Sequence, residues 1–203
     1  MLGPGSSAAT SSRPPSAACA PPPAPTRDED LALVRAAALG DRVAFETVVD
    51  RHGPALTRYA RRAVTDPMDA EDLVQEALVS AWQSLDRFDG RSSLRTWLFG
   101  ILVHKIGSAR RRRRAVPVQD EVLDRPGPGD PLQAASDGEL RRALEAALAT
   151  LPERQRAVWL LVQVEGLSQA EVASALRTTP DAVRGLLARA RRSLAERMGQ
   201  WRA

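Results

Sequence analysis

Residues 165–194 read EGLSQAEVASALRTTPDAVRGLLARARRSL, and this stretch contains the start signals of two consecutive helices. Ser168 and Glu171 have the spacing of a capping box, in which a serine hydroxyl and a glutamate carboxylate satisfy the free amides of a first turn. Thr179 followed by Pro180 is a second start, because proline is favoured at the first helical position. Two helices joined by so short a connection predict a helix-turn-helix.

The second of these helices is strongly basic, with five arginines after Pro180 against Asp181 and Glu196. A helix fits the major groove of DNA, the only groove whose edges distinguish all four base pairs. We expect the start of this helix to lie nearest the bases, with Thr178, Thr179, Asp181 and Arg184. The alternative is a solvated surface helix of an arginine-rich protein, but the preceding capped helix and the tight turn favour DNA binding.

Composition changes on the N-terminal side of this motif divide the chain into four parts. Ser136 with Glu139 makes another capping box, and Pro152 starts a further helix that ends at Gly166, so residues 136–203 form the helix-turn-helix domain. Residues 115–135, rich in proline and glycine, predict a flexible linker. Residues 1–27, made largely of Pro, Ala and Ser, predict a disordered tail.

Residues 28–114 show helical periodicity throughout. A first helix ends at Gly40, and a second begins near Asp41, with Gly53-Pro54 expected to kink or break it. Asp66-Pro67 starts a third helix, expected to end near residues 88–90, and Ser92 or Ser93 caps a fourth. The predicted fold is therefore all-α, with a four-helix N-terminal domain and a C-terminal helix-turn-helix domain.

Charge is segregated along this first domain. Residues 66–76 contain five acidic and no basic residues, whereas residues 87–114 contain nine basic residues and one acidic residue. Asp69, Asp72 and Glu76 share one helical face and could dock on a basic protein surface, although a helix start also favours acidic residues through its dipole. The run from Arg110 to Arg114 suits non-specific contact with phosphates.

Two aromatic residues, Phe88 and Trp97, bracket the polar loop of residues 89–93. A polar loop beside basic helices could hold an unstacked base, because a flipped base needs a pocket and a polar reader of its edge. Trp97 also lies on an apolar stripe with Ile101, which favours a place in the core.

Composition excludes several other classes of protein. The 203 residues include one cysteine, Cys19, so no internal disulfide framework is expected and a cytoplasmic location is favoured. The longest apolar runs are too short for membrane insertion. His52 and His104 lack metal-ligand spacing and there is no phosphate-binding glycine loop, so we expect no enzyme, no metal and no cofactor.

Four ordered motifs resemble those of the extracytoplasmic-function (group IV) sigma factors of RNA polymerase. They are residues 69–76 (DAEDLVQE), 88–98 (FDGRSSLRTWL), 151–156 (LPERQR) and 165–173 (EGLSQAEVA). The resemblance covers about residues 30–198. It implies a factor that binds core polymerase and directs initiation at promoters with minus-ten and minus-thirty-five elements. The alternative is a helix-turn-helix regulator that acts without docking on polymerase.

The resemblance also implies roles for residues and partners. The polymerase clamp, on the largest subunit, would be gripped by Asp69, Asp72, Leu73, Gln75 and Glu76, and the flap would be a further contact. Minus-ten DNA would meet the loop and the helix after it, at Phe88, Asp89, Gly90, Arg91, Ser92, Ser93, Arg95, His104 and Lys105. Minus-thirty-five DNA would meet Arg177, Thr178, Thr179, Asp181, Arg184 and Arg189. An anti-sigma protein is expected as a further partner.

Three positions depart from the family pattern, and they bear on which promoter is read. Gly185-Leu186 stands where the family commonly has a small residue followed by arginine, Arg177 replaces a glycine often found in the turn, and His104-Lys105 replaces a common Arg-Asn pair. These changes leave the class unaltered and affect only the expected DNA contacts.

Overall fold

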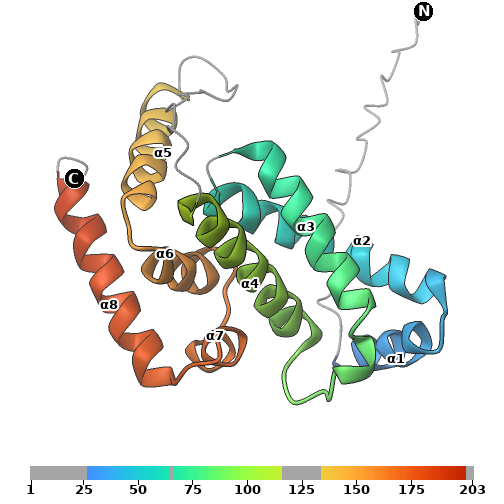
Figure 1. Ribbon diagram of the computed structural model, residues 1–203. Helices are drawn as coiled ribbons and strands as arrows, with labels where there is room; N and C mark the ends of the chain where they lie inside the picture. Colours follow the sequence, from blue (N-terminus) through green and yellow to red (C-terminus); the bar gives the residue numbers. More distant parts are fainter. Residues whose placement is uncertain (1–26, 65, 116–133, 200–203) are drawn as a thin grey trace, which may run out of the picture.

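The computed structural model describes residues 27–64, 66–115 and 134–199, and this part of the chain forms helices and no strand (Figure 1). The elements are α1 (Arg27–Ala38), α2 (Arg42–Ala63), α3 (Pro67–Trp82), a 3₁₀ turn (Leu85–Arg87), α4 (Leu94–Ala115), α5 (Ala134–Ala149), α6 (Glu153–Trp159), a π-helical turn (Leu160–Val164), α7 (Gln169–Ala175) and α8 (Pro180–Arg197). The predicted all-α fold of two helical domains is confirmed. The predicted tail and most of the linker lie outside the described residues.

Local capping signals start the helices of the first domain where the sequence predicts. The Asp41 carboxylate accepts hydrogen bonds from the amides of Val43 and Ala44, at 2.9 and 3.1 Å. Asp66 caps α3 in the same way, with Pro67 at the first helical position. Of the two candidate serines before α4, Ser93 is the cap, since its hydroxyl accepts from the amide of Thr96 at 3.1 Å. Each cap satisfies an amide that has no partner inside the helix.

Of the kink or break predicted at Gly53-Pro54, the break is wrong, because α2 continues from Arg42 to Ala63 through both residues, and the kink stays a prediction. Proline removes one backbone hydrogen bond and crowds the preceding turn. Val48 on one side and Leu56 and Tyr59 on the other are each at most 1% exposed. Burial of both halves in one core therefore holds the helix together across the defect.

The expected end of the third helix near residues 88–90 is also wrong. Helix α3 ends at Trp82, and the Ser84 hydroxyl then donates to the carbonyl of Ser80 at 2.6 Å. This side-chain bond occupies a carbonyl that helix continuation would use, and the chain tightens into the 3₁₀ turn. Leu85 is still buried, but from that turn and not from α3.

The predicted cap at Ser136 is wrong as well, since α5 already begins at Ala134, upstream of Ser136. Alanine has the highest helix propensity, so Ala134 and Ala135 extend the helix past the position of the capping box. The capping pattern therefore predicted correctly that a helix forms here, but it placed the start of this helix too far along the chain.

The first domain has a core in which α2 packs against α1, α3 and α4. Its largest fully buried side chains are Val48, Leu56, Tyr59, Leu94, Leu98, Phe99 and Leu102. Tyr59 and Phe99 pack edge to face with ring centroids 5.5 Å apart, which adds an oriented contact to the buried area. Burial raises the pKa of the Tyr59 hydroxyl well above its ordinary value, so this residue is neutral.

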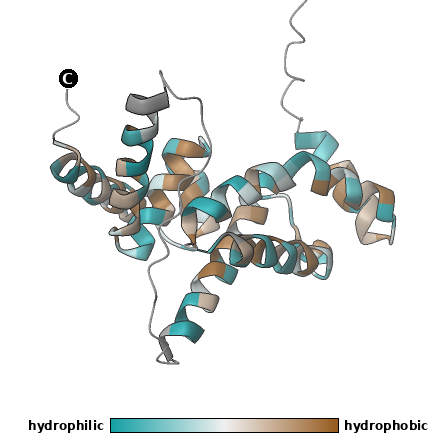
Figure 2. Cartoon of the chain, turned by 90° about the horizontal axis from the view of Figure 1, so that it is seen from above, coloured by the Kyte–Doolittle hydropathy of each residue, from teal (hydrophilic) through white to brown (hydrophobic). Residues whose placement is uncertain are grey.

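The second domain is built by α6 and α7 packed on α8, with α5 along the side of α8 (Figure 1). Val158, Leu161, Val172 and Val183 are fully buried there. Figure 2 shows hydrophobic residues on the inner sides of the helices and hydrophilic residues on their outer turns. The predicted end at Gly166 is confirmed, since this glycine has φ of 70° and ends the helical path after the π-helical turn.

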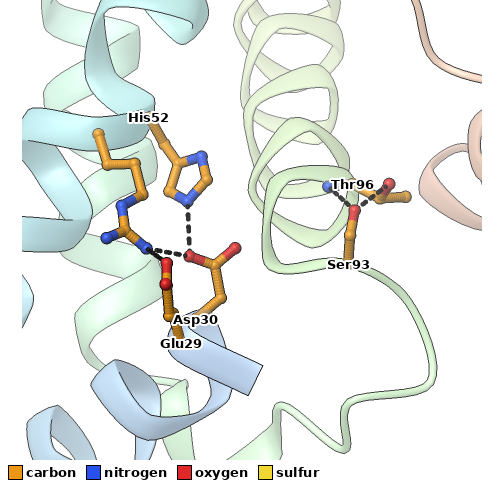
Figure 3. A network of polar contacts seen from close by, with 6 residues as sticks. Glu29, Asp30, His52, Ser93 and Thr96 are labelled. Carbon is orange, nitrogen blue, oxygen red and sulfur yellow. Dashed lines mark hydrogen bonds and ion pairs between the residues drawn. The ribbon is translucent and has the colours of Figure 1, made fainter. Parts of the chain in front are cut away.

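A buried polar cluster ties α1 to α2 (Figure 3). Asp30 accepts a hydrogen bond from Arg51 at 2.9 Å, and His52 Nε2 lies 3.5 Å from the same carboxylate oxygen. Burial lowers the pKa of His52, although the charge of Asp30 opposes the change. The imidazole is therefore neutral near pH 7.

The neutral state of His52 predicts a pH-dependent stability. Unfolding releases a histidine with an ordinary pKa of about 6.5, so the unfolded chain binds more protons at acid pH. The contribution of neutral His52 is fully present above that pH and is lost as the pH falls through the lower folded value. Urea unfolding at pH 7.5 and 5 should show less loss of stability in His52→Gln than in the wild type. Parallel losses in the two proteins would contradict this assignment.

Candidate nucleic-acid interface

The helix-turn-helix forms as predicted, with both of its helices capped. Ser168 Oγ accepts from the amide of Glu171 at 3.2 Å, and the amide of Ser168 donates to the Glu171 carboxylate at 2.9 Å. Burial alone would raise the pKa of the Glu171 carboxyl. The hydrogen bonds that this carboxylate accepts from the amide and hydroxyl of Ser168 and from Thr96 outweigh burial and hold the pKa below its usual value. Thr179 Oγ1 caps α8 by accepting from Ala182 at 3.2 Å.

The turn between α7 and α8 contains a strained residue, Arg177, whose φ is 49°. This is the left-handed region that glycine adopts without cost, and a side chain there costs on the order of 1 kcal/mol. Arg177 is exposed, and so are the predicted DNA contacts Thr179, Asp181, Arg184 and Arg189, while Thr178 is half-buried. The opposite face of α8 is buried through Val183, Leu187, Ala190 and Leu194.

The loop of residues 88–93 is closed by its own hydrogen bonds. Asp89 accepts from the amide of Arg91 at 3.0 Å, and its carboxylate pairs with the Arg91 guanidinium at 3.2 Å. Gly90 has φ of 70°, and a Cβ there would lie 3.1 Å from Leu31, so glycine is required by conformation and by space. The loop therefore rests against α1, with Arg91 exposed.

Phe88 and Trp97 lie against each other at the base of this loop, with ring centroids 5.4 Å apart. Both rings are half-buried, so Trp97 packs on the core and also reaches the surface. Ser92 and Ser93 are also half-buried, and the Ser93 hydroxyl lies 2.8 Å from that of Thr96 (Figure 3).

The acidic face of α3 is largely open. Asp72, Gln75 and Glu76 are exposed. Glu76 pairs with Lys105 at 3.5 Å, and Asp69 pairs with Arg113, so α4 partly neutralises this face. Leu73 is a correction to the predicted docking set: it is 5% exposed and belongs to the core, so its side chain is not part of the open surface.

A carboxylate that the sequence reasoning missed joins the two domains. The side chain of Glu165, just before Gly166, has no exposed area. It accepts from Arg58 of α2 at 2.8 and 3.2 Å and from Arg95 of α4 at 3.1 Å. A signal was available, because an acidic residue is unfavourable at a helix C-terminus and one placed there between apolar neighbours needs a cationic partner.

Three further contacts support the same interface. Thr96, which is 1% exposed, donates to the carboxylate of Glu171 at 3.2 Å. Gly100 of α4 lies against the backbone of Ala175, where a Cβ would be 3.1 Å from the carbonyl oxygen. Arg156 donates to the carbonyl of Ala63 at the end of α2 at 3.3 Å, and burial lowers the pKa of this guanidinium to about 10. The interface is therefore close-packed as well as charged.

This packing brings together residues predicted to contact different DNA elements. Arg95, predicted for minus-ten DNA, is held by Glu165 and also lies over the Phe99 ring at 5.2 Å. His104 and Lys105, predicted for the same element, line one cavity with Arg177, predicted for minus-thirty-five DNA. In this arrangement the minus-ten and minus-thirty-five sites predicted from sequence are thus not independent.

Within residues 27–64, 66–115 and 134–199, no group of three or more His, Cys, Asp or Glu side chains could hold a metal ion. Over the same residues, no helix combines the length and apolar character needed to cross a membrane.

Comparison with known families finds a match in each domain. Residues 48–116 match the family Sigma-70 region 2, and residues 141–194 match the family Sigma-70, region 4. The chain is 33% identical to the ECF RNA polymerase sigma factor SigM of Mycobacterium tuberculosis, over 84% of this chain and 85% of SigM. It is 37% identical to the RNA polymerase sigma factor CnrH of Cupriavidus metallidurans, over 82% of this chain and 93% of CnrH.

Two solved structures are similar to this one. CnrH in complex with the cytosolic domain of CnrY aligns with a TM-score of 0.66 at 34% identity, covering 85% of this chain and 99% of that one. The sigma factor RpoE in complex with the anti-sigma factor NepR, from Bartonella quintana, aligns with a TM-score of 0.63 at 28% identity, covering 76% and 96%.

Removal of the Glu165 carboxylate should separate the two domains. Glu165→Ala leaves Arg58 and Arg95 without their shared partner. We expect the free energy of association between the two domains to fall by roughly 2 kcal/mol. This is below the value for a fully buried pair, because Arg58 is 46% exposed. Small-angle X-ray scattering should report a larger radius of gyration with unchanged helix content by circular dichroism. Glu145→Ala is the control, since Glu145 pairs with Arg141 of its own helix. An unchanged radius in Glu165→Ala would contradict the assignment.

Proposed function

The chain belongs to the extracytoplasmic-function sigma factors of RNA polymerase, and on that premise we propose which of its residues carry each step of promoter recognition. As a member of this family it binds core RNA polymerase and directs promoter-specific initiation. Sigma factors are non-enzymatic initiation factors, and we propose that this chain is likewise not an enzyme. We also propose that it acts in the cytoplasm, where polymerase works.

The alternative, a DNA-binding regulator without polymerase docking, is not favoured. It accounts for the region 4 match over residues 141–194 but leaves the region 2 match over residues 48–116 without a purpose. We propose that the functional units are residues 28–114 and 136–203, with residues 115–135 as the linker.

We assign docking on the polymerase clamp to the acidic face of α3. The single observation that carries this assignment is that Asp72, Gln75 and Glu76 remain exposed while the two domains are packed together. Asp69 lies beside them but is paired with Arg113. It therefore contacts polymerase only after its ion pair with Arg113 breaks. Exposed ion pairs such as Glu76 with Lys105 are weak and can be replaced by pairs with a basic partner surface.

Minus-ten recognition is assigned to the patch formed by the loop of residues 88–93 and the pair Phe88 and Trp97. Half-buried aromatic rings at a surface offer a stacking platform for an unpaired base. Arg91 is exposed beside them and suits a phosphate contact. His104 and Lys105 lie further along α4, where the displaced strand would continue.

Minus-thirty-five recognition is assigned to the start of α8. Arg184 pairs with Asp181 at 2.7 Å, but both side chains are well exposed, so the arginine can leave this pair for a guanine edge. Thr179 and Arg177 flank it, and Arg189 lies further along the helix.

We further propose that promoter binding requires the two domains to separate. Arg95 is held by Glu165, which limits its contact with DNA, and Arg177 lines the same cavity as residues of α4. An anti-sigma protein that holds the packed arrangement would therefore block both promoter contacts. An anti-sigma partner is supported by the similar sigma factor RpoE, which forms a complex with the anti-sigma factor NepR.

Reversal of charge on α3 tests the docking assignment. Asp72→Lys with Glu76→Lys should weaken binding to core polymerase by about tenfold or more, because two attractive contacts become repulsive. Fluorescence anisotropy measures the affinity for core, and transcript start mapping reports promoter-specific initiation. Glu46→Lys with Asp50→Lys, an exposed acidic pair at the same spacing on α2, is the control. Equal core affinity for both double variants would refute docking by α3.

Truncation of Arg184 tests the assignment of minus-thirty-five recognition. Arg184→Ala should cost about 1 to 3 kcal/mol of binding to a minus-thirty-five site if this residue reads a guanine. Arg197→Ala, near the other end of α8, removes the same charge and should change the affinity far less. Electrophoretic mobility shift with mapped promoter DNA gives both values. No loss in Arg184→Ala would transfer recognition to Thr179 or Arg177.

A further inference from the structure

A cavity of about 460 Å³ lies between α4 and the helix-turn-helix, and both domains line it. Helix α4 contributes His104, Lys105 and Arg112, and the turn after α7 contributes Arg177. Ser92, Ser108 and Ser174 add hydroxyl groups, and no lining residue is acidic. A space of this size suits a ligand as large as a small nucleotide.

Arg177 lines this cavity from the turn after α7, where its φ is 49°. A glycine in the same turn would adopt φ near 49° without strain, so the arginine is held there at a cost of on the order of 1 kcal/mol. The left-handed backbone serves the turn, because the Arg177 amide donates to the Ser174 carbonyl at 3.2 Å and the Thr178 amide donates to the Ala173 carbonyl at 2.9 Å. Arginine in place of glycine at this turn adds a positive charge at the edge of the cavity, on a side chain that is exposed.

The charges around the cavity reinforce one another. His104 and Arg177 both line the cavity, and burial together with the positive charges of Arg177 and Arg111 lowers the pKa of His104. Lys105 is paired with Glu76, but only at 3.5 Å and with both groups partly exposed. The cavity therefore has a positive potential that an anion would neutralise.

We propose that this cavity binds a small ligand that carries a pyrophosphate group. Arg112 on α4 and Arg177 on the helix-turn-helix would be the charged contacts of the two phosphates, with His104 and the serine hydroxyls as further donors. A ligand that contacts both domains stabilises their packed arrangement. The ligand also covers His104, Lys105 and Arg177, which are assigned to promoter DNA, so it should compete with DNA for the protein. This competition rests on the proposed function, whereas the binding of the ligand does not.

Inorganic pyrophosphate is the probe, and the full chain is titrated in magnesium-free buffer at constant ionic strength. Calorimetry should show binding to one site, and the melting temperature should rise with pyrophosphate concentration. Arg177→Gly and Arg112→Ala should each weaken binding by about tenfold, since each removes one charge-assisted contact. Arg177→Gly also relieves the backbone strain, so a folding defect is not expected to confuse the result.

Two controls separate this site from general attraction to a basic protein. Arg35→Ala removes an exposed charge on α1, outside the cavity, and should bind pyrophosphate as the wild type does. Glu165→Ala, which separates the domains, should lose most of the affinity while it keeps all four basic residues. Absence of binding, or equal binding by wild type and Arg177→Gly, would overturn the proposal.

A second arm distinguishes a phosphate ligand from the phosphates of DNA. A single-stranded minus-ten oligonucleotide is titrated with and without pyrophosphate, and we expect pyrophosphate to lower its affinity. Binding of the oligonucleotide with no binding of pyrophosphate would overturn the proposal, and so would an oligonucleotide affinity that pyrophosphate does not change. Promoter-specific initiation with core polymerase, measured without pyrophosphate, tests the proposed function separately.

Discussion

The buried carboxylate of Glu165 sets the relation between the two domains. A carboxylate without exposed area is tolerable only when cations and donors surround it, and here Arg58 and Arg95 come from the other domain. Buried ion pairs add little net stability but strongly disfavour arrangements that leave one partner alone. The interaction therefore selects this packing, and the close approach of Gly100 to Ala175 follows from it.

The same packing divides the surfaces into those that stay open and those that are engaged. The acidic face of α3 and the start of α8 remain exposed, whereas Arg95 is bound and Arg177 is turned toward α4. Under the assignments proposed above, docking on polymerase can begin while the domains are packed, but full promoter recognition cannot. The cost of opening is that of parting Glu165 from its arginines, and new contacts with polymerase and DNA must offset it.

Arg177 links the local and the long-range features of the molecule. Its left-handed backbone is required by the tight turn of the helix-turn-helix, and the sequence departs there from the glycine common in the family. The side chain then reaches a cavity that exists only because the domains are packed together. Within the second domain, arginine in place of glycine only adds backbone strain. In the packed structure the same arginine also adds a positive charge to the cavity between the domains.

The sequence by itself determined the helices and their capped starts at Asp41, Asp66, Ser168 and Thr179, because a cap depends on residues within one turn. Its motifs also determined the family, which the comparisons show, while the roles of individual site residues stay predictions. Only the tertiary structure decided that α2 continues through Pro54, that Leu73 is buried and that Glu165 binds Arg58 and Arg95. Those outcomes depend on groups distant in the chain, whose proximity no local pattern encodes.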